Sequence, residues 1–429
     1  MASGPDLVVE GFHGPGGWAE GRRILGLTTR AIGMEWDAAA CATATAAGHT
    51  VIRCDVATMP TAPFRGRIVG KVDSPPCQAW SRAGKGLGLV DQPLVHQAVE
   101  DLAHGRDTRA KLLTACKDPR SLLAAEPMRW HHDLRPEWIA MEEVPDVLPL
   151  WKQYAAILRA WDYSVWVGIL NAADYGVPQT RRRAILIASR VRTVGPPAPT
   201  HTQHPGGEDL FGEDLPGWVS MADALGWNEG LVVNTRGERR TQGGNEFSAD
   251  EPAQTLVKST RSWVLHTNRN QMPDGSRQTA DPYAAPAPTF TSKSGGQWVL
   301  RNGTQKNAAV RELDEPAGTL FFGARCNDVS WVHTRPATTV CSTDRIAPPG
   351  HRDRSPKGES QFASPDTVRI TQAEAAVLQS FRATYPWQGT KTKQFEQIGN
   401  AVPPLLAAHV LSAATGIPMP ATADLAAAA

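Results

Sequence analysis

The sequence predicts an α/β fold built around a doubly wound parallel sheet. Three observations predict it. Short β-branched runs alternate with helical segments along the first third of the chain. A glycine-rich turn at residues 11–17 follows the first run. The next two runs end on Glu35 and Asp55, and a carboxylate about 20 residues after such glycines suits ribose hydroxyls. The fold is therefore expected to bind a cofactor that contains a nucleoside.

The first elements follow from these signals in order. Residues 7–9 form a strand, the glycine turn follows, and a helix begins near Gly17. A second strand ends at Glu35, an alanine-rich helix follows, and a third strand ends at Asp55. Each acid alone also fits a solvated loop position or a helix cap. Together with the glycine turn, the two acids favour a cofactor site.

The fourth strand, at residues 68–72, leads into the segment with the strongest chemical signal. Pro75 and Pro76 end the strand because proline removes a backbone donor. Cys77 follows at the carboxyl edge of the sheet, where open α/β sheets bind ligands. The glycine-rich stretch after it predicts a mobile loop. Taken alone, Cys77 fits a nucleophile and a buried structural thiol equally well.

Further strands and helices continue the pattern as far as residue 194. The expected elements are helix 92–105, strand 136–143, helix 150–160, strand 163–170 and strand 184–188, with residues 106–133 as an insertion of a helix and a loop. The strand at 136–143 ends on Glu142 and Glu143, so a carboxylate could face Cys77 across the sheet edge. Arginines at 181–183 fit a solvated strand edge or a grip on an anion or a phosphate backbone.

Composition excludes several classes of protein. The 429 residues carry 44 basic and 43 acidic side chains, so a nucleic-acid partner would need a local basic surface. The six cysteines are scattered without C-x-x-C pairs, which argues against a zinc ribbon, a disulfide scaffold and any metal site. Neither a signal peptide nor a membrane-spanning run is expected, which predicts a cytoplasmic protein without membrane contact.

A degenerate repeat marks the middle of the chain. Prolines and glycines after residue 190 predict a linker. The pattern Pro-Ala-x-Thr then recurs at residues 252–255, 286–289, 316–319 and 336–339, at intervals of roughly 30 residues for the first three, within the range of stacked units. The repeats predict a β-rich unit, whose loop arginines could contact phosphates or remain solvated.

Six segments resemble the DNA (cytosine-5)-methyltransferases, in the order found in that family. They are 12–17 (F-x-G-x-G-G), 75–81 (P-P-C-Q-x-x-S), 142–144 (Glu-Asn-Val in the family), 179–183 (Q-x-R-x-R), the helix at 369–374, and 397–402 (Q-x-G-N-x-V). The resemblance implies a Rossmann-like mixed sheet of the class I methyltransferase type with a smaller β-rich target-recognition domain. It implies a catalytic domain at 1–194, target recognition at 195–366, and a closing segment at 367–429 that returns to the catalytic domain.

The resemblance also implies roles for individual residues. Cys77 would attack C6 of a flipped-out cytosine, Glu142 would hold and protonate N3, and Arg181 and Arg183 would position the nucleotide. S-adenosylmethionine would contact Phe12, Gly14, Gly16, Gly17, Glu35, Trp36, Asp55, Pro75 and Asn400. Substrate contacts would come from Gln78, Ser81, Gln179, Arg261 and Arg325. The implied partners are duplex DNA and a cognate restriction endonuclease, for a monomer acting at the nucleoid of a bacterium or in its phage.

Three positions depart from the family pattern. Glu10 replaces an Asp, and Gly11 replaces an apolar residue, which would loosen the strand end. Glu143 replaces the Asn of Glu-Asn-Val. Neighbouring strand residues point to opposite faces, so Glu143 need not meet the base. Its charge would raise the pKa of Glu142 and help that residue to carry a proton.

Two other functions stay open. A transfer-RNA cytosine-5 methyltransferase uses the same motifs, although the large middle region favours duplex DNA because the RNA enzymes have a smaller one. A catalytically silent DNA-binding relative is suggested only by Glu143. An amino-group methyltransferase would need an aromatic residue in place of Cys77.

Overall fold

The computed structural model describes most of the catalytic part of the chain and isolated pieces of the middle. The described residues are 6–76, 80, 87–205, 215–226, 232–234, 246–248, 250–254, 264–266, 300–301, 310–311 and 371–421. Among them, no helix has the length and apolar character needed to cross a membrane.

A seven-stranded sheet forms the centre, in the order β3-β2-β1-β4-β5-β8-β6. Its strands are β1 (Leu7–Gly11), β2 (Arg30–Glu35), β3 (Val51–Arg53), β4 (Ile68–Asp73), β5 (Trp138–Glu143), β6 (Ser164–Asn171) and β8 (Arg182–Ser189). The first five run parallel, but β8 is antiparallel to both β5 and β6. The doubly wound parallel sheet predicted from periodicity is therefore wrong at this edge, and the sheet is mixed. The connection from β6 to β8 lacks the long crossover that parallel strands need.

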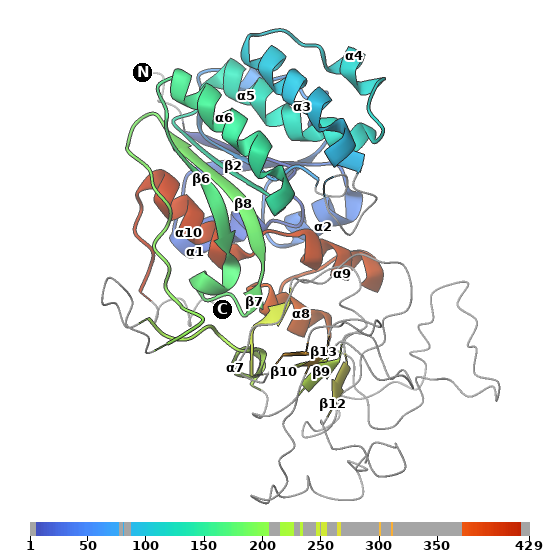
Figure 1. The fold of residues 1–429 in the computed structure, drawn as a ribbon, viewed down its shortest axis with the longest axis vertical. Coiled ribbons are helices and arrows are strands. Elements are labelled where there is room, and N and C mark those ends of the chain that lie inside the picture. Colours follow the sequence, from blue (N-terminus) through green and yellow to red (C-terminus); the bar gives the residue numbers. More distant parts are fainter. Residues whose placement is uncertain are drawn as a thin grey trace, which may run out of the picture.

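Helices cover both faces of the sheet (Figure 1). α1 (Gly17–Leu25) and α10 (Pro404–Thr415) pack together on one face, although they come from opposite ends of the sequence. α3 (Leu87–Ala103), α5 (Glu126–Leu134) and α6 (Leu148–Ala160) cover the other. The remaining helices described are α2 (Ala38–Ala46), α4 (Arg109–Leu113), α7 (Met221–Leu225), α8 (Gln372–Leu378) and α9 (Lys391–Asn400), with short 3-10 turns at Ala62–Phe64, Pro119–Ala125, Pro145–Val147 and Ala172–Tyr175.

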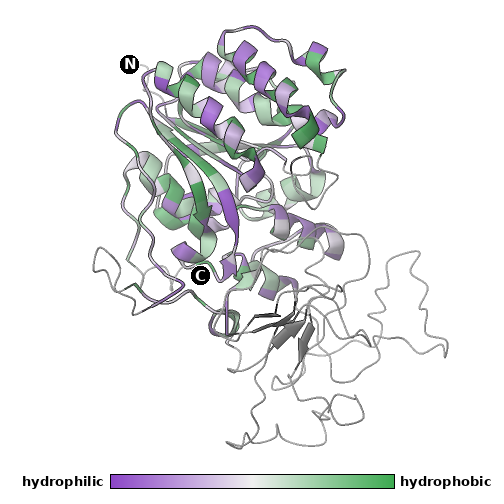
Figure 2. Cartoon of the chain, in the orientation of Figure 1, coloured by the Kyte–Doolittle hydropathy of each residue, from purple (hydrophilic) through white to green (hydrophobic). Residues whose placement is uncertain are grey.

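The two cores follow the alternation of side chains along the strands. In β5, Ile139 and Met141 pack under α3 and α6, whereas Trp138 and Ala140 pack under α1 and α10. β8 alternates in the same way, and Figure 2 shows the resulting hydrophobic strands between the two helical layers. A buried two-sided sheet of this kind holds its strand ends rigidly, so side chains at those ends are well positioned.

Residues 106–133 are not the helix and loop that the sequence predicts. They form α4, a 3-10 turn and all of α5 except its last residue, and they bury Met128, Trp130 and His131 completely or nearly so. Elements this short cannot display a helical period, which is why the pattern is irregular. The segment is part of the core, not an insertion on it.

Beyond α7, the described pieces of the middle region are mainly short strands. β9 (Val232–Asn234) pairs with β10 (Glu246–Ser248) and β12 (Val264–His266), and β13 (Leu300–Arg301) pairs with β14 (Val310–Arg311). β11 (Ala253–Gln254), at the first repeat, pairs in parallel with β7 (Gln179–Thr180). The other three repeats lie outside the described residues, and the domain boundaries stay a prediction.

Candidate active site

A cavity of about 1020 Å³ opens at the carboxyl ends of the parallel strands. Of the residues to which the resemblance assigns a role, eleven line it: Phe12, Gly14, Gly17, Glu35, Trp36, Asp55, Pro75, Glu142, Arg181, Arg183 and Asn400. Parallel strands end at one edge of the sheet, so residues spread over the whole chain meet there. Asn400 comes from the last turn of α9 and reaches the cavity from the closing segment.

The glycine turn brings its backbone to the cavity wall. Phe12, Gly14 and Gly16 all have positive φ angles, of 55°, 58° and 110°. A Cβ atom on Gly14 would meet no atom within 4 Å, so open space lies beside its backbone. A Cβ on Gly16 would lie 2.7 Å from the His49 ring. Gly16 therefore packs against His49 and does not line the cavity. The turn thus presents the backbone to a ligand.

The two strand-end acids are held by backbone N–H groups. Glu35 accepts hydrogen bonds from Gly14 at 2.7 Å and from Asp37 at 2.7 Å, one on each carboxylate oxygen. It therefore joins the glycine turn to the end of β2. Asp55 accepts a hydrogen bond from the N–H of Ala57 at 2.9 Å. Trp36 lies between the two acids in the sequence and is 70% exposed, so its ring is free to cover a ligand.

Glu10 has a structural reason to replace the shorter Asp. Its carboxylate is buried and contacts His13 Nδ1 at 2.9 Å and Arg22 Nη1 at 3.4 Å. Burial raises the pKa of Glu10, but the hydrogen bond and charge of His13 and the charges of Arg22 and His49 outweigh it and lower the pKa overall. The acid anchors the glycine turn from below.

Gly11 does not loosen the end of β1, contrary to expectation. The residue is paired on both sides, with Met34 in β2 and Asp73 in β4. A Cβ atom here would lie 2.2 Å from Asp73 Oδ1 and 3.0 Å from Lys71 Nζ. Those two side chains form a buried ion pair directly under the cavity. Gly11 makes the room that this pair needs.

Glu142 and Arg183 form an ion pair at the other end of the cavity. The distance from Arg183 Nε to Glu142 Oε1 is 3.0 Å, and both side chains are at least nine-tenths buried. Arg181 is also buried and donates to the Gly399 carbonyl at 2.8 Å, which ties it to the closing segment. Antiparallel pairing of β5 with β8 brings these strand-end residues together.

Glu143 lines the same cavity beside Glu142, so neighbouring positions on β5 do not separate the two acids here. Burial, followed by the charge of Glu142, raises the pKa of Glu143 well above its usual range. One carboxyl oxygen accepts the N–H of Val144, and the other has no hydrogen-bond partner among the described residues. The raised pKa favours the protonated, uncharged form of Glu143.

Gln179 is not at the cavity, although its motif predicts a substrate contact. Its side chain is fully buried, and its amide donates to Gln379 Oε1 at 2.5 Å and to the Leu378 carbonyl at 3.4 Å. These contacts use the amide inside the protein, where it joins β7 to α8. Five predicted residues lie outside the described residues: Cys77, Gln78, Ser81, Arg261 and Arg325. Pro75 and Pro76 lead to Cys77 and line the cavity.

Several cavity residues were missed by sequence reasoning. Asp107, Arg109 and Glu126 line the wall next to Asp55, and Lys393 and Gln397 line it from α9. No period or spacing marks the first three, because they belong to the short elements of residues 106–133. Lys393 lies at 3.0 Å from Asp37, a pairing across 356 positions that no local pattern reveals. Among the described residues, no cluster of His, Cys, Asp and Glu could hold a metal ion.

Comparisons with known proteins agree with this geometry. The model of the family "C-5 cytosine-specific DNA methylase" matches residues 108–415. The chain is 28% identical to the type II methyltransferase M.AquIA of a Picosynechococcus species over 245 residues, 51% of this chain and 87% of that protein. It is 25% identical to the type II methyltransferase M.DdeI of Desulfomicrobium norvegicum over 430 residues, 93% and 86% of the two chains. The solved structure of the Entamoeba histolytica methyltransferase EhMeth has the same fold, with a TM-score of 0.50, 13% identity and coverage of 96% and 99%.

Proposed function

Because the chain belongs to the C-5 cytosine-specific DNA methylase family, we propose that it transfers a methyl group from S-adenosylmethionine to C5 of a cytosine flipped out of duplex DNA. One observation carries the proposal. A single cavity is lined by the glycine turn, the strand-end acids Glu35 and Asp55, the Glu142–Arg183 ion pair and the prolines that lead to Cys77. Cofactor and base can therefore meet in one enclosed space.

The residues at the glycine-turn end fit S-adenosylmethionine. Open space beside the Gly14 backbone admits the methionine part, near Phe12 and Asn400. Glu35 suits the ribose hydroxyls, and the exposed ring of Trp36 suits the adenine face. When bound, this cofactor supplies an electrophilic methyl group. Asp55, on the same wall, would accept a hydrogen bond from the adenine amino group.

The chemistry needs a nucleophile because C5 of cytosine does not attack a methyl sulfonium unaided. The Cys77 thiolate adds to C6, and N3 takes a proton from Glu142, which turns the ring into an enamine that is nucleophilic at C5. After C5 accepts the methyl group, its proton leaves to a base. The bond from C6 to Cys77 then breaks, which restores the 5,6 double bond and the thiolate, and N3 returns its proton to Glu142. Atoms and charges balance without a metal or an oxidant.

Arg183 orients Glu142 for this work. The guanidinium occupies Oε1 at 3.0 Å, which leaves Oε2 for N3 of the base. Arg181 holds the closing segment through Gly399 and lines the same space, so it joins the wall of the base pocket to the cofactor wall. Extrusion of the base is the general route by which methyltransferases reach a target atom inside a duplex.

Residues 195–366 are proposed to read the DNA. Loop cations there, among them Arg261 and Arg325, would contact phosphates or guanine edges, and Gln78 and Ser81 would contact the nucleotide near Cys77. Relatives such as M.AquIA and M.DdeI are named type II methyltransferases. We therefore propose a cognate restriction endonuclease as functional partner, with the methyltransferase acting as a monomer.

Labelled S-adenosylmethionine tests the reaction. We expect incorporation into plasmid DNA, not into transfer RNA, and sequencing of the product should find 5-methylcytosine at one recognition site. Label in transfer RNA alone would favour the RNA enzyme, and no transfer at all would favour a silent DNA-binding relative. DNA containing 5-fluorocytosine should trap the wild-type protein covalently, and the Cys77→Ser variant should lose the trapped complex while keeping its affinity for DNA.

A further inference from the structure

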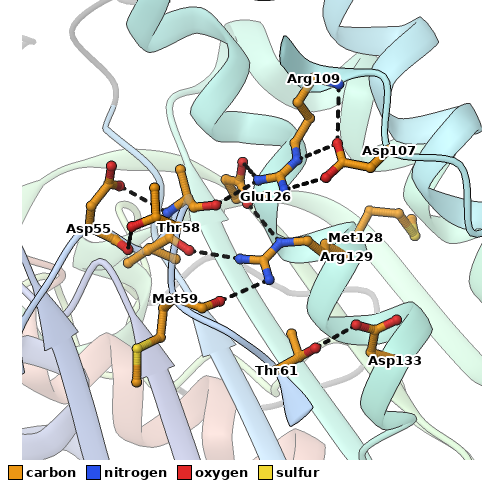
Figure 3. Close-up of polar contacts among 12 residues, drawn as sticks. Asp55, Thr58, Met59, Thr61, Asp107, Arg109, Glu126, Met128, Arg129 and Asp133 are labelled. Atoms are coloured by element: carbon orange, nitrogen blue, oxygen red, sulfur yellow. Dashed lines mark hydrogen bonds and ion pairs between the residues drawn. The ribbon is translucent and has the colours of Figure 1, made fainter.

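The loop that follows Asp55 is held by two arginines, of which Arg109 lines the cavity and Arg129 does not. Figure 3 shows their guanidinium groups pointing at this loop from the segment that contains α4 and α5. The loop, residues 55–59, forms part of the wall next to the proposed adenine position, through Asp55, Val56, Ala57 and Thr58. The arginine clasp is defined here as Arg109, Glu126 and Arg129.

Arg129 makes three contacts with one planar group. Its Nη2 donates to the Val56 carbonyl at 2.8 Å, its Nη1 to the Met59 carbonyl at 2.9 Å, and its Nε to Glu126 at 3.2 Å. The side chain is mostly buried and does not line the cavity. Arg129 can therefore influence a ligand only through the loop that it holds.

Arg109 binds the Ala57 carbonyl, which lies between the Val56 and Met59 carbonyls in the loop. Its Nη1 donates to the Ala57 carbonyl at 2.8 Å and also contacts Glu126, while Asp107 binds the same guanidinium through both carboxylate oxygens, at 2.8 and 2.6 Å. Glu126 is 3% exposed and lies between the two arginines. One buried carboxylate thus fixes the spacing of both cations, and three loop carbonyls accept hydrogen bonds from them.

We propose that the arginine clasp sets the adenine edge of the cofactor site, with Arg129 as a positioning residue. The inference rests on the proposed function, since it needs the adenosyl group in this cavity. The Asp55 carboxylate is bound by the N–H of Ala57. The Ala57 carbonyl accepts a hydrogen bond from Arg109, and the Val56 carbonyl, which belongs to the same peptide group as the Ala57 N–H, accepts one from Arg129. Rotation of these peptide groups would move the carboxylate away from the amino group it recognises.

Isothermal titration with two ligands tests the clasp. S-adenosylhomocysteine carries the 6-amino group of adenine, and S-inosylhomocysteine carries an oxygen there. We expect Arg129→Gln to weaken binding of S-adenosylhomocysteine about tenfold, a typical change for lost hydrogen bonds to a charged group. Binding of S-inosylhomocysteine, already weak in the wild type, should not change. Steady-state assays should find a raised KM for S-adenosylmethionine with unchanged kcat and unchanged KM for DNA.

Matched variants separate positioning from folding. Arg106→Gln removes a similar pairing, with Asp101 at 2.9 Å, at a residue that does not line the cavity, and should leave both affinities unchanged. Arg129→Lys keeps the charge but loses the planar fork, so it should recover part of the affinity. It also serves as the test variant if Arg129→Gln does not fold.

Two results would contradict the proposed role of the arginine clasp. Equal affinity of S-adenosylhomocysteine for the wild type and for a folded Arg129 variant would exclude it and leave the proposed function intact. Equal loss for both ligands would mean a general disturbance of the site and not an effect on the adenine edge. A wild-type protein that binds neither S-adenosylhomocysteine nor S-adenosylmethionine would instead overturn the proposed function and this inference with it.

Discussion

The two ends of the cavity hold their carboxylates by different means. At the glycine-turn end, Glu35 and Asp55 accept hydrogen bonds from backbone N–H groups of the loops they belong to or contact. At the β5 end, Glu142 pairs with the guanidinium of Arg183, and the buried Glu143 has the N–H of Val144 as its hydrogen-bond partner among the described residues. The first end is a scaffold of peptide groups, and the second is a small cluster of charges.

This difference suits the proposed division of work. Backbone donors hold a carboxylate in one orientation, which is what recognition of ribose and adenine requires. Two adjacent buried acids disfavour each other's charge even with Arg181 and Arg183 nearby, so the protonated form of Glu143 is favoured. The β5 end is therefore suited to proton transfer, and the glycine-turn end to binding. Substitutions at the two ends should separate kcat from cofactor affinity.

The largest effect should come from Glu142→Gln. The amide keeps the shape and can still accept a hydrogen bond from Arg183, but it supplies no proton to N3. General acid catalysis contributes about 10²- to 10⁴-fold, so kcat should fall by that factor. Affinity for S-adenosylhomocysteine should stay the same, because Glu142 lies at the other end of the cavity. Single-turnover assays with saturating DNA measure the first quantity, and titration calorimetry the second.

Glu137→Gln is the matched control for that variant. Glu137 directly precedes β5, at the opposite end of the strand, and does not line the cavity. Its substitution should leave the rate unchanged. A Glu142→Gln enzyme as fast as this control would show that the acid has no part in the chemistry.

Glu35→Gln should produce a smaller effect of the opposite kind. The substitution replaces one carboxylate oxygen with an NH₂ group, which donates hydrogen bonds and cannot accept them. This group would face one of the two backbone N–H donors, Gly14 or Asp37, and that hydrogen bond would be lost. Hydrogen bonds to charged groups are worth about 1.5–3 kcal/mol, so the Kd for S-adenosylhomocysteine should rise about 10- to 100-fold. The value of kcat at saturating cofactor should change little. The half-exposed Glu100 on α3 gives the control Glu100→Gln. A fall in kcat with unchanged affinity would reverse the assignment of the two ends.

The glycine-turn end is also the end that could be predicted from sequence. Glu35 ends β2 and Asp55 lies two residues beyond the end of β3, and the carboxyl ends of parallel strands meet at one edge of a sheet. The turn itself needs residues that tolerate positive φ, and glycine marks two of those three positions in the sequence. Arg109 and Arg129 carry no such mark. They act on carbonyl groups whose directions depend on the folded backbone, and no residue spacing encodes those directions.

Long-range pairing limits prediction at the β5 end in the same way. Gln179 belongs to a recognisable motif, yet its partner Gln379 lies 200 positions away and keeps it inside the protein. The mixed sheet was implied by the family resemblance, but the direction of β8 could not be predicted from its apolar run, because the sequence of a buried strand looks the same in both directions. The raised pKa of Glu143 comes first from its burial, which only packing against the rest of the chain decides.

The smallest expected effect sharpens this last point. A carboxyl group whose pKa is raised by folding binds more protons in the folded chain than in the unfolded one. The contribution of Glu143 to stability is then complete below its usual pKa of 4.5 and is lost as the pH rises through the raised value. Glu143→Gln is neutral at every pH, so its Tm should exceed that of the wild type at alkaline pH by about 2–4 °C for each kcal/mol relieved. Near pH 4 the two should melt together, and Glu143→Asn, which restores the family residue, should follow the Gln variant. Melting curves measured from pH 4 to 9 that stay parallel would mean that Glu143 is ionised in the folded protein, and the β5 end would then hold two carboxylates beside the guanidinium groups of Arg181 and Arg183.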